Sequence, residues 1–523
     1  MLQQTREQAA DRRELGAGSA ISFGGAAFSA GAGFVLVVVL GRTLGDSGAG
    51  IVFQVIAVFN IALAFGRVSM DSAALWLLPR LAMDRSAALA STAWGMVAVS
   101  GLAGSLGALA VIVWNAASHG PDASELLAAI VTLPVAAMLM TALAATRALG
   151  GVMPYAAIGN VLLPGARPLL VLLAVTLGWG TLGASIAWAL PVIPALLLAF
   201  AVLSGLLRRR DALGPASSAT VASPATRPAS ASIPRRIAGY AAPRVISAVF
   251  EQLLIWGGVL VVGAVASSAD AGVYAAASRF IAAGMIVDTA LRVVVAPMFS
   301  RMHHSGDRGQ MRAVFRTATI WLLLFSTPIF LLLAVFAPLM LGITGPEFVR
   351  GAEVLAIMSL GTVLVLLAGN IHSVLIMGGR SGLAAANKFV VVAVNLALIP
   401  VLMPAFGLSG AAWAWVIATA LDAALATLQV RFALGIRLPL TAGVRPLAIG
   451  VLTVGVPALL VRLWLGPSWL GLAVATVLGG AIFLVWCRMD RSRLELAALL
   501  RPSSATQPAP SDRHGVNPRG IHA

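Results

Sequence analysis

The chain has 523 residues, of which 59% are hydrophobic and 10% are charged, and its mean hydropathy is +0.95. One soluble core cannot bury so much apolar surface, and the sequence lacks the alternating polarity of a membrane β-barrel. The formal charge of +16 is spread along the chain rather than gathered on one polar domain, which argues against nucleic-acid binding. The composition therefore predicts an all-α polytopic membrane protein.

Apolar segments long enough to cross a bilayer, which takes ~20 helical residues, recur along the whole chain. Fourteen transmembrane helices are predicted, at residues 17–41, 49–78, 87–114, 124–146, 154–176, 181–207, 237–265, 271–298, 313–341, 351–377, 383–402, 408–430, 446–464 and 468–487. An even number of spans places both termini on the same side of the membrane.

Basic residues predict the orientation of these spans. With the amino terminus in the cytoplasm, 27 of the 35 Lys and Arg lie in cytoplasmic segments. The exceptions are three outer residues, Arg42, Arg350 and Arg462, and five residues within spans, Arg67, Arg167, Arg244, Arg279 and Arg292. Because Lys and Arg in short loops favour the cytoplasmic side, we predict a multi-pass protein of the cytoplasmic (inner) membrane with both termini cytoplasmic.

Polar segments divide the chain. Residues 208–236, RRRDALGPASSATVASPATRPASASIPRR, are rich in Ala, Ser and Pro and have basic ends, which is typical of a flexible linker. The predicted divisions are a cytoplasmic tail (1–16), an N-terminal lobe with six spans (17–207), a cytoplasmic linker (208–236), a C-terminal lobe with six spans (237–430), two further spans (431–487) and a disordered cytoplasmic tail (488–523).

Two pairs of phrases indicate an internal duplication. GTLGASIAW at 180–188 and GLSGAAWAW at 407–415 agree at five of nine positions, 227 residues apart. GRTLGDSGAGIV at 41–52 and GAVASSADAGVY at 263–274 share their first glycine and an Ala-Gly pair, 222 residues apart. Similar offsets at two independent points predict a repeat. Since an even number of spans precedes each copy, the two six-helix lobes are predicted to be parallel repeats, related by an axis along the membrane normal.

The first pair of phrases also predicts local packing. Gly183 and Gly410 each follow a very short hairpin at the outer face, where a small residue lets neighbouring helices approach closely. Trp188, Trp413 and Trp415 lie in the first turns of the same helices. We expect these rings near headgroup depth, as interfacial anchors rather than as a ligand cage.

NLALIPVLMPAFGLSGAAWAW at 395–415 resembles the characteristic segment of polysaccharide and oligosaccharide flippases, and LGRTLGDSGAGIV at 40–52 resembles their N-terminal signature. These flippases form the polysaccharide transporter branch of the multidrug, oligosaccharidyl-lipid and polysaccharide exporter superfamily. The resemblance implies a monomeric, two-lobed transporter that moves an undecaprenyl-pyrophosphate-linked glycan to the outer leaflet. The lipid-linked glycan, membrane lipid and other polysaccharide-assembly proteins are then the candidate partners.

Charged residues within the spans fall at spacings that share a helix face. Arg67 and Asp71 are four residues apart, as are Asp288 and Arg292, while Arg244 and Glu251 are seven apart. Charges at such depth are costly against lipid, so they are expected to face a wet interior. Since Arg67 and Arg292 fall on repeat-equivalent spans, we expect them to face each other across the lobe interface.

Two interpretations of these arginines stay open. Guanidinium groups bind phosphate oxygens bidentately, so Arg67, Arg244 and Arg292 are candidate ligands of a pyrophosphate headgroup. Alternatively, each pair is a structural ion pair that braces the helices, with Asp71 and Asp288 as neutralising partners. Arg167, between two prolines in PGARP, either reaches the cavity or satisfies carbonyl groups freed at a kink.

Buried carboxylates are candidates for ion coupling. Glu251, Asp288 and Asp422 lie well inside their spans, where desolvation disfavours the ionised form and permits proton exchange as the lobes move. Two alternatives to the flippase are an ion-coupled exporter of drugs or small molecules and a membrane glycan polymerase or ligase. The sequence shows no nucleotide-binding loop, catalytic carboxylate pair on a polar domain or Cys/His cluster. It predicts neither an enzyme nor a cofactor or metal site.

Overall fold

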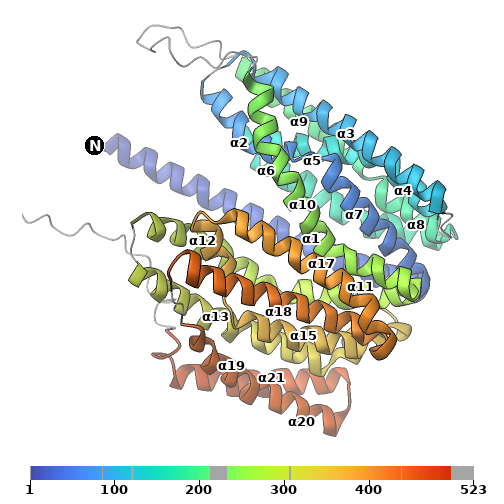
Figure 1. Ribbon diagram of the computed structural model, residues 1–523, viewed down its shortest axis with the longest axis vertical. Coiled ribbons are helices and arrows are strands. Elements are labelled where there is room, and N and C mark those ends of the chain that lie inside the picture. The colour runs from blue at the N-terminus through green and yellow to red at the C-terminus, as the bar shows by residue number, and fades with distance from the viewer. Residues whose placement is uncertain are drawn as a thin grey trace, which may run out of the picture.

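The computed structural model describes the backbone of residues 2–84, 86–118, 123–211, 232–305, 308–436 and 439–495. Figure 1 shows two bundles of helices that lie side by side and converge at one end. Most of the predicted linker and of the carboxyl-terminal tail lies outside the described residues, as do the side chains of residues 1–23.

The helices follow one another with short connections. The N-terminal lobe comprises α1 (Leu2–Gly66), α2 (Met70–Met83), α3 (Leu89–Ser118), α4 (Ala123–Ile130), α5 (Leu133–Ala148), α6 (Val152–Tyr155), a π-helical turn η1 (Ala156–Leu162), α7 (Leu163–Thr176), α8 (Gly180–Ala189) and α9 (Val192–Asp211). The C-terminal lobe comprises α10 (Ser232–Val265), α11 (Ser268–Gly284), α12 (Ile286–Ser305), α13 (Arg308–Val335), α14 (Ala337–Gly342), η3 (Pro346–Gly351), α15 (Ala352–Leu366), α16 (Ile371–Met377), α17 (Ser381–Phe406) and α18 (Leu408–Ala433). The chain continues through η4 (Leu440–Gly443), α19 (Val444–Gly450), η5 (Val451–Gly455), α20 (Val456–Leu465) and α21 (Trp469–Met489).

α1 contains the first predicted span and most of the second. Its apolar part, Gly24–Gly66, has 43 residues, and at ~1.5 Å per residue this is about twice the ~30 Å thickness of a bilayer core. Gly45 has φ 70° and ψ −173°, a conformation that glycine adopts readily and other residues avoid. The chain therefore turns sharply at Gly45.

In the described part of the chain, twelve helices are long and apolar enough to cross a membrane. A thirteenth is obtained when Ser268–Gly284 and Ile286–Arg292, bent by 44°, count as one span. The predicted all-α membrane fold is confirmed. The predicted number of fourteen is one higher, because the first predicted span and most of the second lie in the one helix α1. The last two predicted spans correspond to Thr441–Leu465 and Trp469–Met489.

Several predicted spans are interrupted, among them the two that carry Arg67 and Arg292. The span predicted at 49–78 leaves the helix between Gly66 and Met70, where Val68 and Ser69 have φ 47° and 51°. This left-handed conformation is rare for a β-branched residue such as Val68. The span predicted at 271–298 bends after Gly284. The prediction of continuous helices is wrong at both points, because hydropathy reports how apolar a segment is and not its backbone path.

The lobes touch most closely where the two copies of the repeated Ala-Gly pair meet. A Cβ atom on Gly50 of α1 would lie 1.7 Å from the carbonyl oxygen of Ser268, and one on Gly272 of α11 would lie 2.2 Å from that of Asp46. No residue with a side chain fits at such distances. The repeated glycines therefore let α1 and α11 approach backbone to backbone.

Polar contacts join the lobes at the same end. Arg350 contacts Asp46 of the N-terminal lobe at 3.0 Å and Asp270 of its own lobe at 2.5 Å. Arg42 donates from Nε to the carbonyl oxygen of Ile343 at 2.8 Å, again between lobes. Two of the three arginines that the charge distribution places outside thus hold this end closed.

Trp188 is buried inside the protein rather than exposed as an interfacial anchor. Only 3% of its surface is exposed, and its ring packs edge-on against Phe59 with the ring centroids 5.1 Å apart. Trp413, by contrast, is 45% exposed. The prediction for Trp188 is wrong because α8 packs against α7, α4 and α1. The ring therefore faces protein.

The last two spans are attached to the C-terminal lobe. α20 and α21 pack against each other, and both pack against η5. In turn, η5 and α20 pack against α13. At the end of α21, Asp490 accepts two hydrogen bonds from Arg445, at 2.5 and 2.8 Å. Trp321 of α13 donates to the carbonyl oxygen of Leu494 at 3.3 Å. These contacts indicate that α20 and α21 move with the C-terminal lobe.

Candidate functional site

A cavity of about 250 Å³ lies between the N-terminal lobe and α10. It is lined by Ala64, Arg67, Ser69, Asp71, Ser72, Arg244, Ser247, Ala248 and Glu251. Arg67 is 17 residues beyond the close contact at Gly50, or ~25 Å along α1, so the cavity lies on the linker side of the closed end. The cavity thus brings together four of the eight predicted site residues.

The break between α1 and α2 brings Arg67 and Asp71 to the cavity. Asp71 lies in the first turn of α2, where the helix dipole favours a carboxylate. Arg67 Nη1 donates to Asp71 Oδ2 at 3.0 Å, and both side chains keep about a quarter of their surface exposed. Arg67 Nε is buried and has no hydrogen-bond partner among the described residues. The guanidinium group therefore retains a free donor beside its ion pair.

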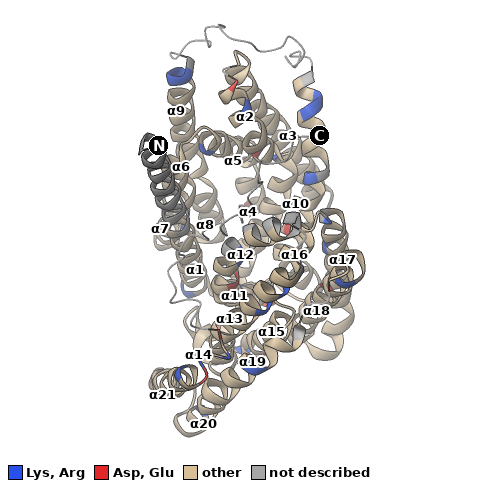
Figure 2. Cartoon of the chain, turned by 90° about the vertical axis from the view of Figure 1, so that its left-hand side faces the viewer, with Lys and Arg blue, Asp and Glu red and all other residues tan. Residues whose placement is uncertain are grey.

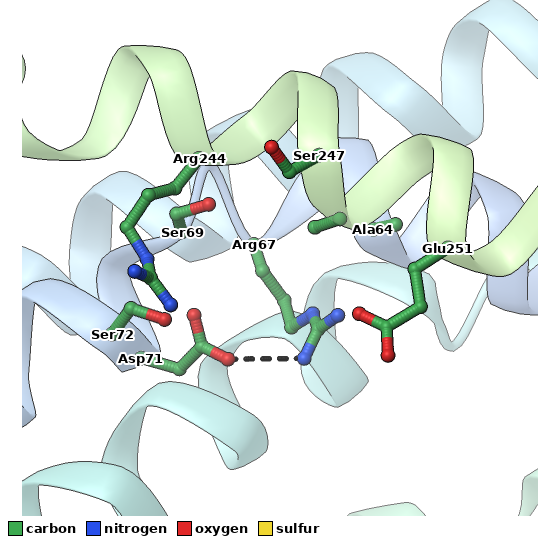
Figure 3. Close-up of a pocket in the computed structure, with 9 residues that line it drawn as sticks. Ala64, Arg67, Ser69, Asp71, Ser72, Arg244, Ser247 and Glu251 are labelled. Carbon is green, nitrogen blue, oxygen red and sulfur yellow. Dashed lines mark hydrogen bonds and ion pairs between the residues drawn. The ribbon is translucent and has the colours of Figure 1, made fainter. Parts of the chain in front are cut away.

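α10 supplies the opposite wall. Arg244 and Glu251 are two turns apart on one face, and both residues are exposed. Figure 3 shows Glu251 directed toward Arg67, and Arg244 directed toward Asp71 and Ser72. Two guanidinium groups, two carboxylates and several hydroxyls therefore face one space. An anion that enters competes with the carboxylates for the guanidinium groups.

Asp288 and Arg292 lie elsewhere. They form an ion pair within α12, with Asp288 buried in the first turn and more than half of the Arg292 side chain exposed. Neither residue lines the cavity. Arg292 and Arg67 do not face each other in this structure, because the 44° bend after Gly284 directs α12 against α13 and α16 of its own lobe. The contacts of Arg292 match the bracing interpretation.

Arg167 is partly buried and does not line the cavity. Its Nε donates to the carbonyl oxygen of Trp188 at 3.1 Å, and its guanidinium carbon lies 4.2 Å from the centre of the same residue's ring. A cation over an indole face is electrostatically favourable. Of the two predicted alternatives, these contacts match the one in which Arg167 satisfies a backbone carbonyl.

Asp422 is the centre of a separate polar cluster inside the C-terminal lobe. Its Oδ2 lies 2.9 Å from Lys388 Nζ and 3.3 Å from His372 Nε2, so α16, α17 and α18 each contribute one residue. The residue is 6% exposed, and its Oδ1 has no hydrogen-bond partner among the described residues. The sequence does not reveal this cluster, because its members are 34 and 50 residues from Asp422.

Arg279 is a further, partly buried cation that the sequence leaves without a role. Its guanidinium carbon lies 3.9 Å from the centre of the Trp256 ring, and its Nη2 is buried without a hydrogen-bond partner in the described part of the chain. The contact joins α11 to α10. No spacing along the chain signals it, since the two residues meet only when the helices pack.

Two helical lobes in one chain, closed against each other at one end and separated by a charged cavity toward the other, resemble in fold the solved members of the multidrug, oligosaccharidyl-lipid and polysaccharide exporter superfamily. A lipid II flippase, MurJ, in an inward closed conformation is similar over 92% of this chain and 99% of its own, with a TM-score of 0.63 and 13% identity. An inward-facing multidrug transporter of the same superfamily is similar over 77% of this chain and 94% of its own, with a TM-score of 0.58 and 14% identity. At these identities the likeness concerns the fold alone.

Two comparisons of the sequence itself point to proteins of glycan biosynthesis. A profile described as "Polysaccharide biosynthesis protein" matches residues 215–345. A curated relative, the probable low-salt glycan biosynthesis flippase Agl15 of Haloferax volcanii, is 29% identical over 203 residues, which are 37% of this chain and 40% of that protein. The chain thus matches less than half of that relative's length. Together these findings confirm the predicted resemblance to polysaccharide flippases.

Proposed function

We propose that the protein moves an undecaprenyl-diphosphate-linked oligosaccharide from the inner to the outer leaflet of the cytoplasmic membrane, for export of a cell-surface polysaccharide. The observation that carries this proposal is the cavity in which Arg67 and Arg244 lie together between the lobes. Guanidinium groups bind phosphate oxygens through paired hydrogen bonds, and intramembrane charges of this kind are a mark of function. The family and relative that match the sequence support the substrate class.

The distribution of charge supports the direction of transport. Arg208, Arg209 and Arg210 lie in the last turn of α9, and Arg235 and Arg236 lie near the start of α10, so the ends of both helices nearest the linker are basic (Figure 2). By the positive-inside rule this end faces the cytoplasm. The closed end then faces outward, and the cavity is positioned to receive a headgroup from the inner leaflet.

Transport then follows from movement of the two lobes. An entering diphosphate competes with Asp71 and Glu251 for the cavity arginines, which loosens the contacts between α2 and α10. Rocking of the lobes breaks the contact of Arg350 with Asp46 and separates Gly50 from Ser268, so that the cavity opens outward. One chain supplies both lobes, so a monomer suffices for this cycle.

A small-molecule exporter shares the fold, since the multidrug transporter DinF-BH, solved with R6G, has a TM-score of 0.55 to this chain and 18% identity. The two carboxylates of the cavity balance its two guanidinium groups, so its net charge does not decide between these substrates. The sequence match to a glycan flippase favours the flippase. Transport of cationic dyes by vesicles that contain the purified protein, in place of lipid-linked glycan, would support the exporter.

Loss of the protein is expected to trap a complete lipid-linked repeat unit in the inner leaflet. Cells without the protein should accumulate this species, and wild-type protein should clear it. Mass spectrometry of undecaprenyl-linked glycans measures the accumulation. An unchanged lipid-linked pool together with an intact surface polysaccharide would contradict the proposed function.

We further propose that Asp422 couples transport to an ion gradient. Its carboxylate is buried and bonded to Lys388 and His372, so gain or loss of a proton or cation there changes how α16, α17 and α18 hold together. Glu251 and Asp288 are the other candidates from the sequence. Asp288 is already paired with Arg292, and Glu251 faces the substrate cavity. These contacts leave Asp422 as the best-placed coupling residue.

The double substitution Asp422→Asn with Lys388→Met is expected to abolish the response of flipping to a pH gradient while leaving headgroup binding intact. Both charges are removed together, because a single substitution leaves a buried charge unpaired at a cost of about 3–5 kcal/mol. Flipping in proteoliposomes, with and without the gradient, measures the effect. Thr427→Ala, on the same helix, is the control. A double variant that still responds to the gradient would exclude this role for Asp422.

A further inference from the structure

Two facing stripes of side chains run from the cavity toward the linker end. Their members are four residues apart: Ser72, Trp76 and Arg80 on α2, and Arg236, Tyr240 and Arg244 on α10. Residues four apart lie on one helix face. α2 runs toward the linker end and α10 runs away from it, so the stripes meet in antiparallel order. Ser72 and Arg244 also line the cavity, which makes the stripes continuous with it.

An aromatic stack joins the two stripes. The rings of Trp76 and Tyr240 are nearly parallel, at 7°, with centroids 4.7 Å apart. The guanidinium carbons of Arg80 and Arg236 lie 4.7 and 5.7 Å from the centre of the Trp76 ring, and that of Arg244 lies 5.5 Å from the centre of the Tyr240 ring. Three cations from two lobes therefore gather around one pair of rings.

Ion pairing within the described part of the chain leaves these three cations available to an anion. Among the described residues, no ion pair joins Arg80, Arg236 or Arg244 to a carboxylate. All three residues are exposed. Contact with the rings offsets part of the repulsion between like charges. A multiply charged anion that contacts several of these arginines at once would offset the remaining repulsion.

We propose that Arg80, Arg236 and Arg244 form a first contact site for a diphosphate headgroup at the inner leaflet, from which the headgroup passes to Arg67 in the cavity. This inference rests on the proposed function and extends it to the order of binding. A diphosphate offers more charge and more oxygen acceptors than the single phosphodiester of an ordinary phospholipid. Planar guanidinium groups bind such oxygens bidentately, so several arginines together favour the diphosphate. The aromatic stack suits headgroup depth, where amphipathic rings are favoured.

The test compares two double variants that remove the same charge from the same end of the molecule. Arg80→Gln with Arg236→Gln removes two cations of the contact site, and Arg208→Gln with Arg209→Gln removes two from the end of α9. The full chain in phosphatidylcholine nanodiscs is titrated with undecaprenyl diphosphate and undecaprenyl monophosphate, and binding is followed by native mass spectrometry. We expect the first variant to bind the diphosphate about tenfold more weakly and to lose its preference over the monophosphate, as for loss of charge-assisted hydrogen bonds. The second should bind as wild type does.

Equal losses in both double variants would overturn the contact site, because general surface charge would then explain them. Unchanged binding in the first variant would overturn it as well. If Arg67→Ala weakens binding in that case, the proposed function stands without the contact site. If wild-type protein binds no polyprenyl diphosphate, the proposed function itself fails. Should the first variant not fold, Arg236→Gln alone, at an exposed position near the start of α10, is expected to weaken diphosphate binding about threefold.

Discussion

Flipping is expected to fall at least about tenfold in an Arg67→Ala variant, with no change in the amount of folded protein. Arg67 supplies a charge-assisted contact to the headgroup, and loss of one such bond costs about 1.5–3 kcal/mol, or about tenfold or more in binding. Its guanidinium group contacts Asp71 through Nη1 at 3.0 Å and lines the cavity with 23% of the side chain exposed, so the other terminal nitrogen is available to a phosphate. Mass spectrometry of the lipid-linked glycan in complemented cells measures the loss.

Asp71→Asn separates binding from bracing. It weakens the same ion pair but leaves Arg67 in place with less competition for its donors. If Arg67 binds the headgroup, Asp71→Asn keeps headgroup binding while Arg67→Ala loses it. If the pair only braces the break between α1 and α2, both variants lower the amount of folded protein alike. Arg209→Ala, which removes one charge at the exposed end of α9, controls for net charge.

A Gly50→Ala variant is expected to open the outer end and to stop flipping. The added Cβ would lie 1.7 Å from the carbonyl oxygen of Ser268, so α1 and α11 cannot keep their present contact. Overpacking of a close contact costs about 1–3 kcal/mol, which is enough to shift two lobe arrangements of similar energy toward the outward-open one. Spin labels on a Cys487→Ser background, at the exposed positions Thr176 and Ala405, report the distance between the lobes.

Gly33→Ala is the matched control for Gly50→Ala. Gly33 lies on the same helix and has no atom within 4 Å of the position that a Cβ would take. The Gly33→Ala variant should show the same distances between the two spin labels, and the same rate of flipping, as wild type. If Gly50→Ala does not fold, Arg350→Ala weakens the same end by loss of a contact instead of by a clash, and the outer distance should again increase. An unchanged distance in a folded, active Gly50→Ala protein would contradict the proposed closed state.

Contacts between residues four apart in the sequence could be predicted because such spacing is local. The ion pairs Arg67–Asp71 and Asp288–Arg292 both form at the expected spacing of four residues. The expected approach of Arg292 to Arg67 does not occur, because the chain bends after Gly284 and breaks after Gly66. Neither interruption is visible in hydropathy. Tertiary contacts rather than local propensity select the backbone path there.

The sequence by itself determined the membrane class, the helical fold and the resemblance to polysaccharide flippases. Hydropathy, charge distribution and the repeated phrases are sums or patterns along the chain. They do not depend on how the helices pack. Only the tertiary structure decided which intramembrane charges meet. Arg67 and Arg244 are 177 residues apart yet line one cavity, while Arg167 contacts Trp188 and Asp422 contacts Lys388 away from it. The physical reason is that the direction of a side chain across a helix interface depends on breaks, bends and neighbouring helices, which no single segment encodes.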